Sequence, residues 1–189
     1  RDCGRLFDAY RRCNICPLGS AAFAGTGFGI DRQMTAEYLG FTKPMENSMD
    51  GVASRDFILE TMSALSLLMI NTSRMCEELV LWSSAFIRFV DLNDAYCSTS
   101  SIMPQKKNPD TAEIMRGKSG TAVGELMAGL TLMKGLPMSY NRDMQDLTPH
   151  LWRAIDAAAQ SVQILADMVQ TAVFNTDRMA DEADHGNST

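Results

Sequence analysis

A stretch without proline or glycine limits the possible folds of this chain more than any other feature. It covers residues 54–90. Apolar residues recur in it at close to helical spacing: Leu59, Met62, Leu65, Met69, Leu79, Trp82 and Phe86. One helix of that length would run for roughly 55 Å at about 1.5 Å per residue. A compact globule of this size has a radius of gyration of only about 16 Å, so we expect an elongated bundle of long helices.

Apolar residues also lie outside this main stripe of the first long helix. They are Ile58, Leu67, Leu68, Ile70 and Val80. A helix that is apolar on several faces needs cover on several faces. We therefore expect partners beyond the chain itself, with oligomerisation as the first explanation and a missing part of the same chain as the second.

A second long helix is predicted from Asn108-Pro109 to about Lys134, because Asn suits the N-cap and Pro the first helical position. Three small residues on one face of it predict a tight helix crossing: Gly120, Gly124 and Ala128. A third helix begins at Thr148-Pro149. Its expected core stripe consists of Ile155, Val162, Leu165, Val169 and Val173.

The N-terminal part has shorter elements. One helix is predicted to end near Arg12, and another to run from Asp31 to near Gly40. The segment Pro17–Gly29 between them is rich in glycine and small residues, which predicts a loop whose backbone closely approaches another part of the protein. No segment favours a strand. The fold class is therefore all-α, and we interpret residues 1–189 as one central helical-bundle domain, a fragment whose N-terminal and C-terminal parts are absent.

Charge and cysteine content exclude several functions. The net charge is −6 and the isoelectric point about 4.9, which argues against a nucleic-acid partner because nucleic-acid-binding surfaces are basic. No apolar run approaches the roughly 18 residues of a membrane span, and no signal peptide is recognisable. The five cysteines are expected to be reduced thiols in the cytoplasm. Cys13 and Cys16 lack a second pair at matching spacing, so no metal site is expected.

The segment between the first two long helices differs from its surroundings. It contains four consecutive hydroxyl residues, two lysines and then a helix start: Ser98, Thr99, Ser100, Ser101, Lys106, Lys107 and Asn108-Pro109. Hydroxyl donors, cations and a helix N-terminus together suit a carboxylate or a phosphate. The alternative is a polar surface loop before a well-capped helix, and composition alone favours that alternative.

A family resemblance changes this balance. Residues 100–109 (SSIMPQKKNP) resemble the signature loop of the fumarase/aspartase superfamily. Within that superfamily, the version QKKNPD resembles the argininosuccinate lyase family. Further similar stretches are PLGS at 17–20, AGT at 24–26, IDR at 30–32, ENSMD at 46–50, SRDF at 54–57 and GLPMSYNRDMQ at 135–145. The resemblance thus extends over nearly the whole chain.

The resemblance implies a β-elimination that converts argininosuccinate to arginine and fumarate without a cofactor or a metal. The reaction passes through a carbanion delocalised into a neighbouring carboxylate, so the main catalytic demand is to stabilise that negative charge. Two alternatives stay open. The chain could belong to another lyase of the superfamily, such as an adenylosuccinate lyase, or to a non-enzymatic relative of the lens-crystallin type.

The resemblance also assigns roles to residues. It implies that Ser100 removes the proton and that Glu113 pairs with a catalytic histidine that this sequence lacks. The implied substrate-binding residues are Lys106 and Asn108 for the carboxylate, and Tyr140 and Gln145 for the arginine portion. It further implies a cytoplasmic homotetramer whose active sites each draw on three subunits. We therefore expect residues 1–189 alone to be inactive.

Some residues depart from the family pattern or lie outside it. Thr99 replaces the glycine that usually precedes the two serines, which predicts a stiffer loop. The run Asp146-Leu147-Thr148 lacks the usual lysine, so a cationic contact with the substrate is in doubt. His150 and His185 match no catalytic position, and we interpret both as surface histidines.

Overall fold

The computed structural model describes residues 1–185, which are predominantly helical. Seven α-helices lie in this range: α1 Asp2–Cys13, α2 Arg32–Tyr38, α3 Ser48–Ala53, α4 Asp56–Ser83, α5 Asp110–Met133, α6 Leu147–Thr171 and α7 Thr176–His185. Two 3₁₀ helices accompany them: η1 Asp94–Tyr96 and η2 Arg142–Asp146. The all-α prediction is confirmed. No helix of the described range is long and apolar enough to cross a membrane.

Within residues 1–185, six two-residue strands, which the sequence did not predict, join the helices. They form three pairs: β1 (Ile15–Cys16) with β2 (Lys43–Pro44), β3 (Val90–Asp91) with β6 (Val173–Phe174), and β4 (Ser98–Thr99) with β5 (Lys107–Asn108). The first pair is parallel and the other two are antiparallel. Strands this short have no alternating pattern long enough to be recognised in a sequence.

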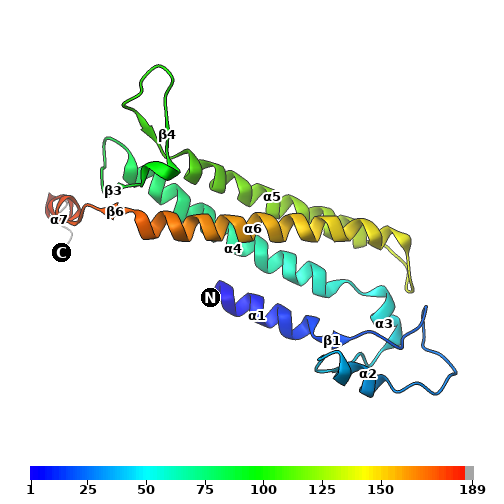
Figure 1. The fold of residues 1–189 in the computed structure, drawn as a ribbon. Helices are drawn as coiled ribbons and strands as arrows, with labels where there is room; N and C mark the ends of the chain where they lie inside the picture. Colours follow the sequence, from blue (N-terminus) through cyan, green and yellow to red (C-terminus); the bar gives the residue numbers. More distant parts are fainter. Residues whose placement is uncertain (186–189) are drawn as a thin grey trace. The chain divides into compact units, whose positions relative to one another are not determined.

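The chain divides into two compact units. The first contains Arg1–Leu67 and Ala122–Ile155, and the second contains Leu68–Thr121 and the described residues from Asp156 onward. The three long helices α4, α5 and α6 each contribute a segment to both units, and Figure 1 labels them.

In the first unit, one arginine organises the loop between α1 and α2. Arg32 donates hydrogen bonds to the Leu18 carbonyl at 3.2 Å, to Ser20 Oγ at 3.3 Å and to the Met45 carbonyl at 2.8 Å. Gly19 has a φ of +85°, and a Cβ there would lie 2.7 Å from Arg32 Cγ. The predicted close approach of the loop backbone is therefore confirmed at Gly19. Asp31 caps α2 by accepting a hydrogen bond from the Met34 N–H, as expected.

The close helix approach in the first unit occurs at Gly129. A Cβ at this position would lie 3.0 Å from Leu147 Cδ1 and 3.1 Å from Leu59 Cδ2. The predicted crossing at Gly120, Gly124 and Ala128 is not formed at the two glycines within residues 1–185, because a Cβ at either glycine meets no other part of the described chain within 4 Å. That face of α5 points away from the packed side, on which Ala122 and Gly129 are buried.

The core of the second unit combines residues from α4, β3, α5 and α6. Its buried members are Cys76, Leu79, Val90, Leu92, Ala112, Met115, Leu165 and Met168. Val90 and Leu92 flank Asp91, so both neighbours of this carboxylate are fixed in the core.

Helix α4 ends at Ser83, several residues before the predicted end near Val90. Ser83 Oγ donates to the Val80 carbonyl at 3.1 Å, a bond that competes with continuation of the helix. Arg88 then adopts a φ of +57°, and the Phe89 N–H bonds back to the Trp82 carbonyl at 2.9 Å. Phe86 consequently lies outside the helix and is 91% exposed, so its place in the core stripe was wrong.

The other residues of α4 follow the expected pattern more closely. Met62, Leu65, Met69 and Leu79 are buried as predicted. Leu67 and Ile70 stay exposed at 44% and 42%, as expected for a helix with apolar side chains on several faces.

Helix α6 buries small residues more than the predicted valines. Its buried positions are Leu147, Ala154, Ala157, Ala158, Ser161, Leu165 and Met168. Leu165 was predicted correctly, and Ile155 and Val169 are half-buried. Val162 is 40% exposed, and Val173 is 66% exposed because it lies beyond the helix in β6. A stripe of alanines permits close packing, which a search for large apolar residues overlooks.

Candidate functional site

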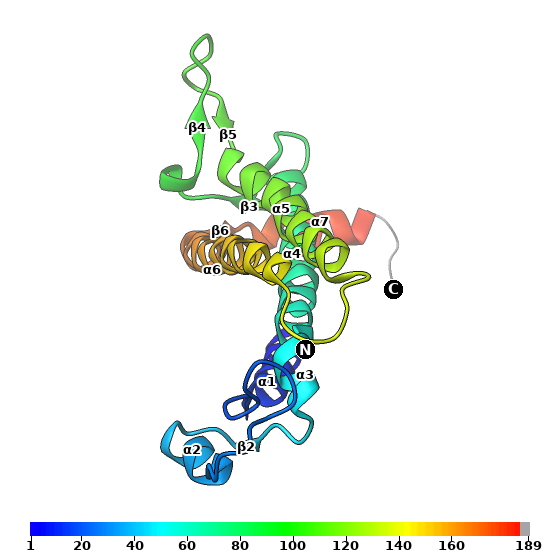
Figure 2. The same cartoon turned by 90° about the vertical axis from the view of Figure 1, so that its right-hand side faces the viewer.

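The segment that resembles the signature loop is a β-hairpin in the second unit. Ser98 pairs with Asn108, and Thr99 pairs with Lys107. Figure 2 shows the two strands, β4 and β5, with their connecting loop and the start of α5 directly after β5. Thr99 thus belongs to the hairpin base, and extended backbone suits a β-branched side chain. The expected stiffening by Thr99 stays a prediction.

Helix α5 begins at Asp110, one residue after the predicted first position. The Glu113 N–H donates to the Pro109 carbonyl at 3.2 Å, which makes Pro109 the residue that precedes the helix. Asn108 is therefore a strand residue and not the N-cap. The helix still begins next to the hairpin base, and its N-terminus carries the partial positive charge that attracts anions.

The two serines of the loop differ in their environment. Ser100 Oγ accepts hydrogen bonds from the N–H groups of Ile102 and Met103, both at 3.3 Å. Donors directed at a hydroxyl oxygen favour its deprotonated form, although the same bonds also stabilise the turn. Ser101 follows with an exposed side chain.

The two adjacent lysines also differ. Lys107 Nζ lies 2.8 Å from Asp91 Oδ1 and 2.7 Å from Asp94 Oδ1, and these two carboxylates raise the pKa of Lys107. Lys106 is exposed, and no carboxylate within residues 1–185 forms an ion pair with it. The sequence indicated that both lysines supply positive charge. Of these two lysines, Lys106 is the one whose charge no carboxylate of the described residues neutralises.

The structure places the remaining site residues in different elements. Glu113 is exposed in the first turn of α5, within the same unit as the hairpin. Tyr140 and Gln145 belong to the first unit, and the Gln145 side-chain amide donates to Tyr140 Oη at 2.9 Å. Ser100, Lys106 and Asn108 are thus brought together in one hairpin. Tyr140 and Gln145 form a second, separate pair around η2.

The segment without the usual lysine passes directly into α6. Leu147 is fully buried, where it packs against Gly129, and Thr148 is exposed. The burial of Leu147 gives this position a packing role, and no cation lies in the run Asp146-Leu147-Thr148.

The interpretation of His150 as a surface histidine was wrong. Its side chain is only 25% exposed, and Nδ1 bonds to Glu125 Oε2. Arg153 donates to the same carboxylate through Nε at 2.6 Å and through Nη2 at 2.9 Å. The pKa of Glu125 is lowered, chiefly by the hydrogen bond from Arg153; burial opposes this lowering, and the hydrogen bond with His150 adds to it. The spacing of His150 and Arg153 on one face of a helix was the signal that could have suggested a shared partner. His185, by contrast, is exposed as predicted.

This cluster makes stability depend on pH. A carboxyl group whose pKa is lowered on folding stabilises the protein above its unfolded-state pKa, and this stabilisation is lost as the pH falls through the folded-state pKa. We expect Glu125→Gln to lower the free energy of unfolding at pH 7 by about 1–3 kcal/mol, since it removes charged hydrogen bonds from a side chain that is only 14% exposed. The difference from wild type should shrink below about pH 4.3, the ordinary pKa of glutamate.

Urea unfolding of the full-length protein across this pH range measures the difference. Glu60→Gln is the matched control, because Glu60 pairs with Arg12 at 2.6 Å on an exposed surface. That change should cost clearly less than Glu125→Gln, because solvent screens an exposed ion pair. Equal effects of the two changes at pH 7 would contradict the importance of the cluster.

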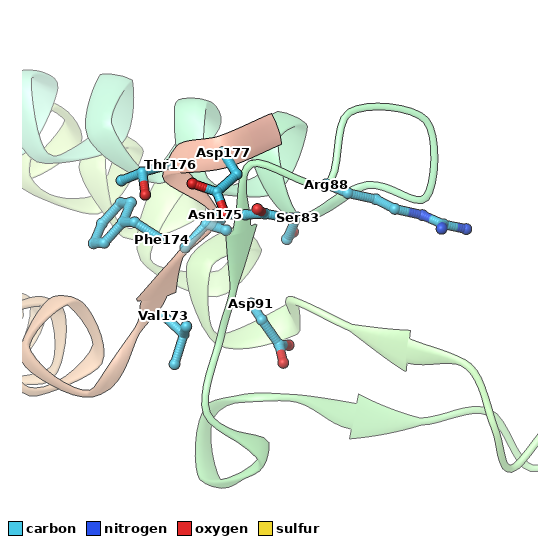
Figure 3. A pocket seen from close by; sticks show the side chains of 9 residues that line it. Ser83, Arg88, Asp91, Val173, Phe174, Asn175, Thr176 and Asp177 are labelled. Atoms are coloured by element: carbon cyan, nitrogen blue, oxygen red, sulfur yellow. The ribbon is translucent and has the colours of Figure 1, made fainter. Parts of the chain in front are cut away.

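A cavity in the second unit lies outside the predicted loop. It has a volume of about 460 Å³ and is lined by β3, β6 and the start of α7. Figure 3 shows its lining side chains, with Arg88 directed away from the others. Asp91 lines this cavity and also contacts Lys107. A smaller cavity of about 270 Å³ lies against the hairpin itself and includes Thr99, Lys106 and Lys107 in its lining.

The cysteines provide no metal centre within residues 1–185. No group of three or more histidine, cysteine, aspartate or glutamate side chains there could hold a metal ion. All five cysteines are free thiols, and Cys13 Sγ contacts the Phe57 carbonyl at 3.6 Å.

Comparison with known proteins identifies the family. A family model described as "Lyase" matches residues 1–124. The chain belongs to this family of lyases. Over all 189 residues it is 67% identical to an argininosuccinate lyase of Methanocorpusculum labreanum and 61% identical to one of Methanoculleus marisnigri. The chain spans 38% of the length of each of these relatives.

Solved structures share the fold. An EDDS lyase in complex with formate has a TM-score of 0.85 and 34% sequence identity, over 96% of this chain and 36% of that one. A class II fumarase from Schistosoma mansoni has a TM-score of 0.84 over 97% of this chain and 43% of that one. At 18% identity, the fumarase shows a common fold only. These likenesses confirm the predicted helical domain of the fumarase/aspartase superfamily.

Proposed function

We propose that this chain is the central part of an argininosuccinate lyase, which cleaves argininosuccinate to arginine and fumarate by β-elimination. The proposal depends chiefly on Lys106, an exposed cation that pairs with no carboxylate among residues 1–185, in a hairpin that leads into the N-terminus of α5. Relatives that are 61–67% identical are named argininosuccinate lyases, and an EDDS lyase variant was solved with bound fumarate. A hairpin of this composition suits a dicarboxylate product.

The chemistry assigns a role to each hairpin residue. The base removes a proton from the carbon next to a carboxylate, and the electron pair of that C–H bond moves into the carboxylate. Lys106 and Asn108 bind this carboxylate, whose charge increases in the transition state. The electrons then form the double bond of fumarate, and the bond to the guanidinium nitrogen breaks. The leaving nitrogen takes up a proton as arginine is released.

Ser100 is the proposed base. The two N–H groups directed at its Oγ support this role, because they stabilise an alkoxide. Ser101 is the second candidate, since its side chain is exposed and the turn does not use it. Replacing each serine separately distinguishes them.

The other assignments need residues from outside this chain. Glu113, exposed at the start of α5, is proposed to pair with a histidine of another segment or subunit. Tyr140 and Gln145, already hydrogen-bonded to each other, are proposed to contact the arginine portion of the substrate. The exposed apolar residues Leu67 and Ile70 support a homotetramer with shared active sites. We propose a cytoplasmic enzyme that needs neither a metal nor a cofactor.

An assay of the full-length protein tests the function. Fumarate release is measured with argininosuccinate and with adenylosuccinate in parallel, and residues 1–189 alone serve as the incomplete control. We expect turnover of argininosuccinate by the full-length protein only. Turnover of adenylosuccinate alone would identify the alternative lyase, and no turnover of either substrate would favour the crystallin-like relative.

A further inference from the structure

The hairpin carries two neighbouring lysines with different electrostatic environments. Lys107 contacts two carboxylates, Asp91 at 2.8 Å and Asp94 at 2.7 Å, whereas Lys106 contacts none in the described chain. Two carboxylates around one ammonium group leave a local charge of about −1. A substrate carboxylate is therefore repelled from Lys107 and attracted to Lys106.

The two carboxylates belong to a part of the protein that is held in place. Asp91 lies in β3 between Val90 and Leu92, which are only 4% and 2% exposed. Asp94 begins η1, whose N-terminus is capped by the Asn93 side chain. The backbone at both positions is therefore held in place, and the two exposed carboxylates, 76% and 92% accessible, extend from it towards Lys107.

Lys107 belongs to the β4–β5 hairpin, which needs contacts with the rest of its unit to keep one position. It lies in β5 and pairs across the hairpin with Thr99, one residue before Ser100. Only two residue pairs form the β4–β5 ladder, and so short a ladder is weak on its own. The two contacts of Lys107 thus connect the base of a weak hairpin to the core of its unit.

We propose that Asp91 and Asp94 are positioning residues for the lyase reaction, acting through Lys107 to fix the hairpin base. This inference rests on the function proposed above. The contacts of Lys107 with Asp91 and Asp94, here called the clamp, set the position in which the loop presents Ser100 and Lys106 to the substrate. It also assigns the two lysines separate tasks: Lys107 holds the hairpin and Lys106 binds the anion.

Kinetics of the full-length enzyme test the clamp. Lys107→Met should lower kcat about ten- to a hundredfold, because a small displacement of reacting groups costs that much. KM should change less. Lys107→Arg should restore most of the activity, since a guanidinium also pairs with carboxylates. Lys118→Met, an exposed lysine on α5, is the matched control and should retain wild-type kinetics.

The carboxylates provide an independent check. The double variant Asp91→Asn with Asp94→Asn should lower kcat to a similar extent as Lys107→Met. Combining all three changes should be no worse than Lys107→Met alone, because residues that act through one contact are not additive. Fully additive losses would overturn the clamp.

Thermolysin cleavage separates positioning from general destabilisation without measuring activity. Ile102 is 87% exposed at the hairpin tip and provides a cleavage site there. In Lys107→Met, cleavage before Ile102 should become several-fold faster, while the thermal midpoint stays near that of wild type. Unchanged cleavage, or a kcat equal to wild type, would overturn the inference. A wild-type enzyme that releases no fumarate would instead reject the proposed function, and the cleavage result would still decide whether the clamp exists.

Discussion

Replacing Lys106 with methionine should lower kcat/KM of the full-length enzyme for argininosuccinate by about a thousandfold, the loss found when a principal donor to a developing negative charge is removed. Lys106 is the exposed lysine of the hairpin, and no carboxylate of the described chain neutralises it. Methionine keeps an unbranched side chain of similar length, so the change mainly removes the charge. Steady-state measurement of fumarate release provides both kcat and KM.

The neighbouring lysine is the natural comparison for this result. Lys107→Met removes the same charge one position later, but there the charge is already paired with two aspartates. We expect Lys106→Met to be at least about ten times more damaging, since it removes a direct contact with the transition state. If Lys107→Met proved the more damaging change, the assignment of the two lysines would be reversed.

Replacing the catalytic serine should have the second large effect. Ser100→Ala is expected to lower kcat by about a thousandfold, within the usual range for loss of a general base, with little change in KM. Alanine cannot accept the proton. It also removes the acceptor of the two N–H bonds at 3.3 Å, which loosens the turn locally. The thermal midpoint is therefore measured beside kcat.

Ser101→Ala is the matched variant for this prediction. It removes a hydroxyl group from an exposed position next to Ser100, where the turn does not depend on it. We expect a smaller loss than for Ser100→Ala. A larger loss from Ser101→Ala, with an unchanged thermal midpoint, would assign the base to Ser101 and limit Ser100 to the turn.

Long helices were predictable because their signals are local. The stretch free of proline and glycine became α4, and the Asn-Pro and Thr-Pro pairs lie at the beginnings of α5 and α6. Helix ends and packed faces were less predictable. The end of α4 at Ser83 depends on a serine hydroxyl and on the left-handed conformation of Arg88, neither of which changes the apolar pattern.

Packing faces depend on which neighbour comes closest. Gly120 and Gly124 have the spacing of a tight crossing, yet the close approach occurs at Gly129, against Leu59 and Leu147. Similarly, alanines rather than valines occupy the buried side of α6. A single helix pattern cannot show which of its small residues another helix will meet.

For this protein, the sequence by itself determined the helical class and the chemical type of the loop, because helical periodicity and a run of hydroxyl and lysine residues are properties of neighbours along the chain. Only the tertiary structure decided which of the two lysines is available to bind an anion. It also decided the partner of His150, which shares Glu125 with Arg153. Asp91 and Asp94 precede Lys107 by 16 and 13 residues, and Glu125 precedes His150 by 25. Residues so far apart along the chain come into contact only in the folded protein. These contacts decide which charges are neutralised, and a sequence pattern of neighbouring residues does not contain them.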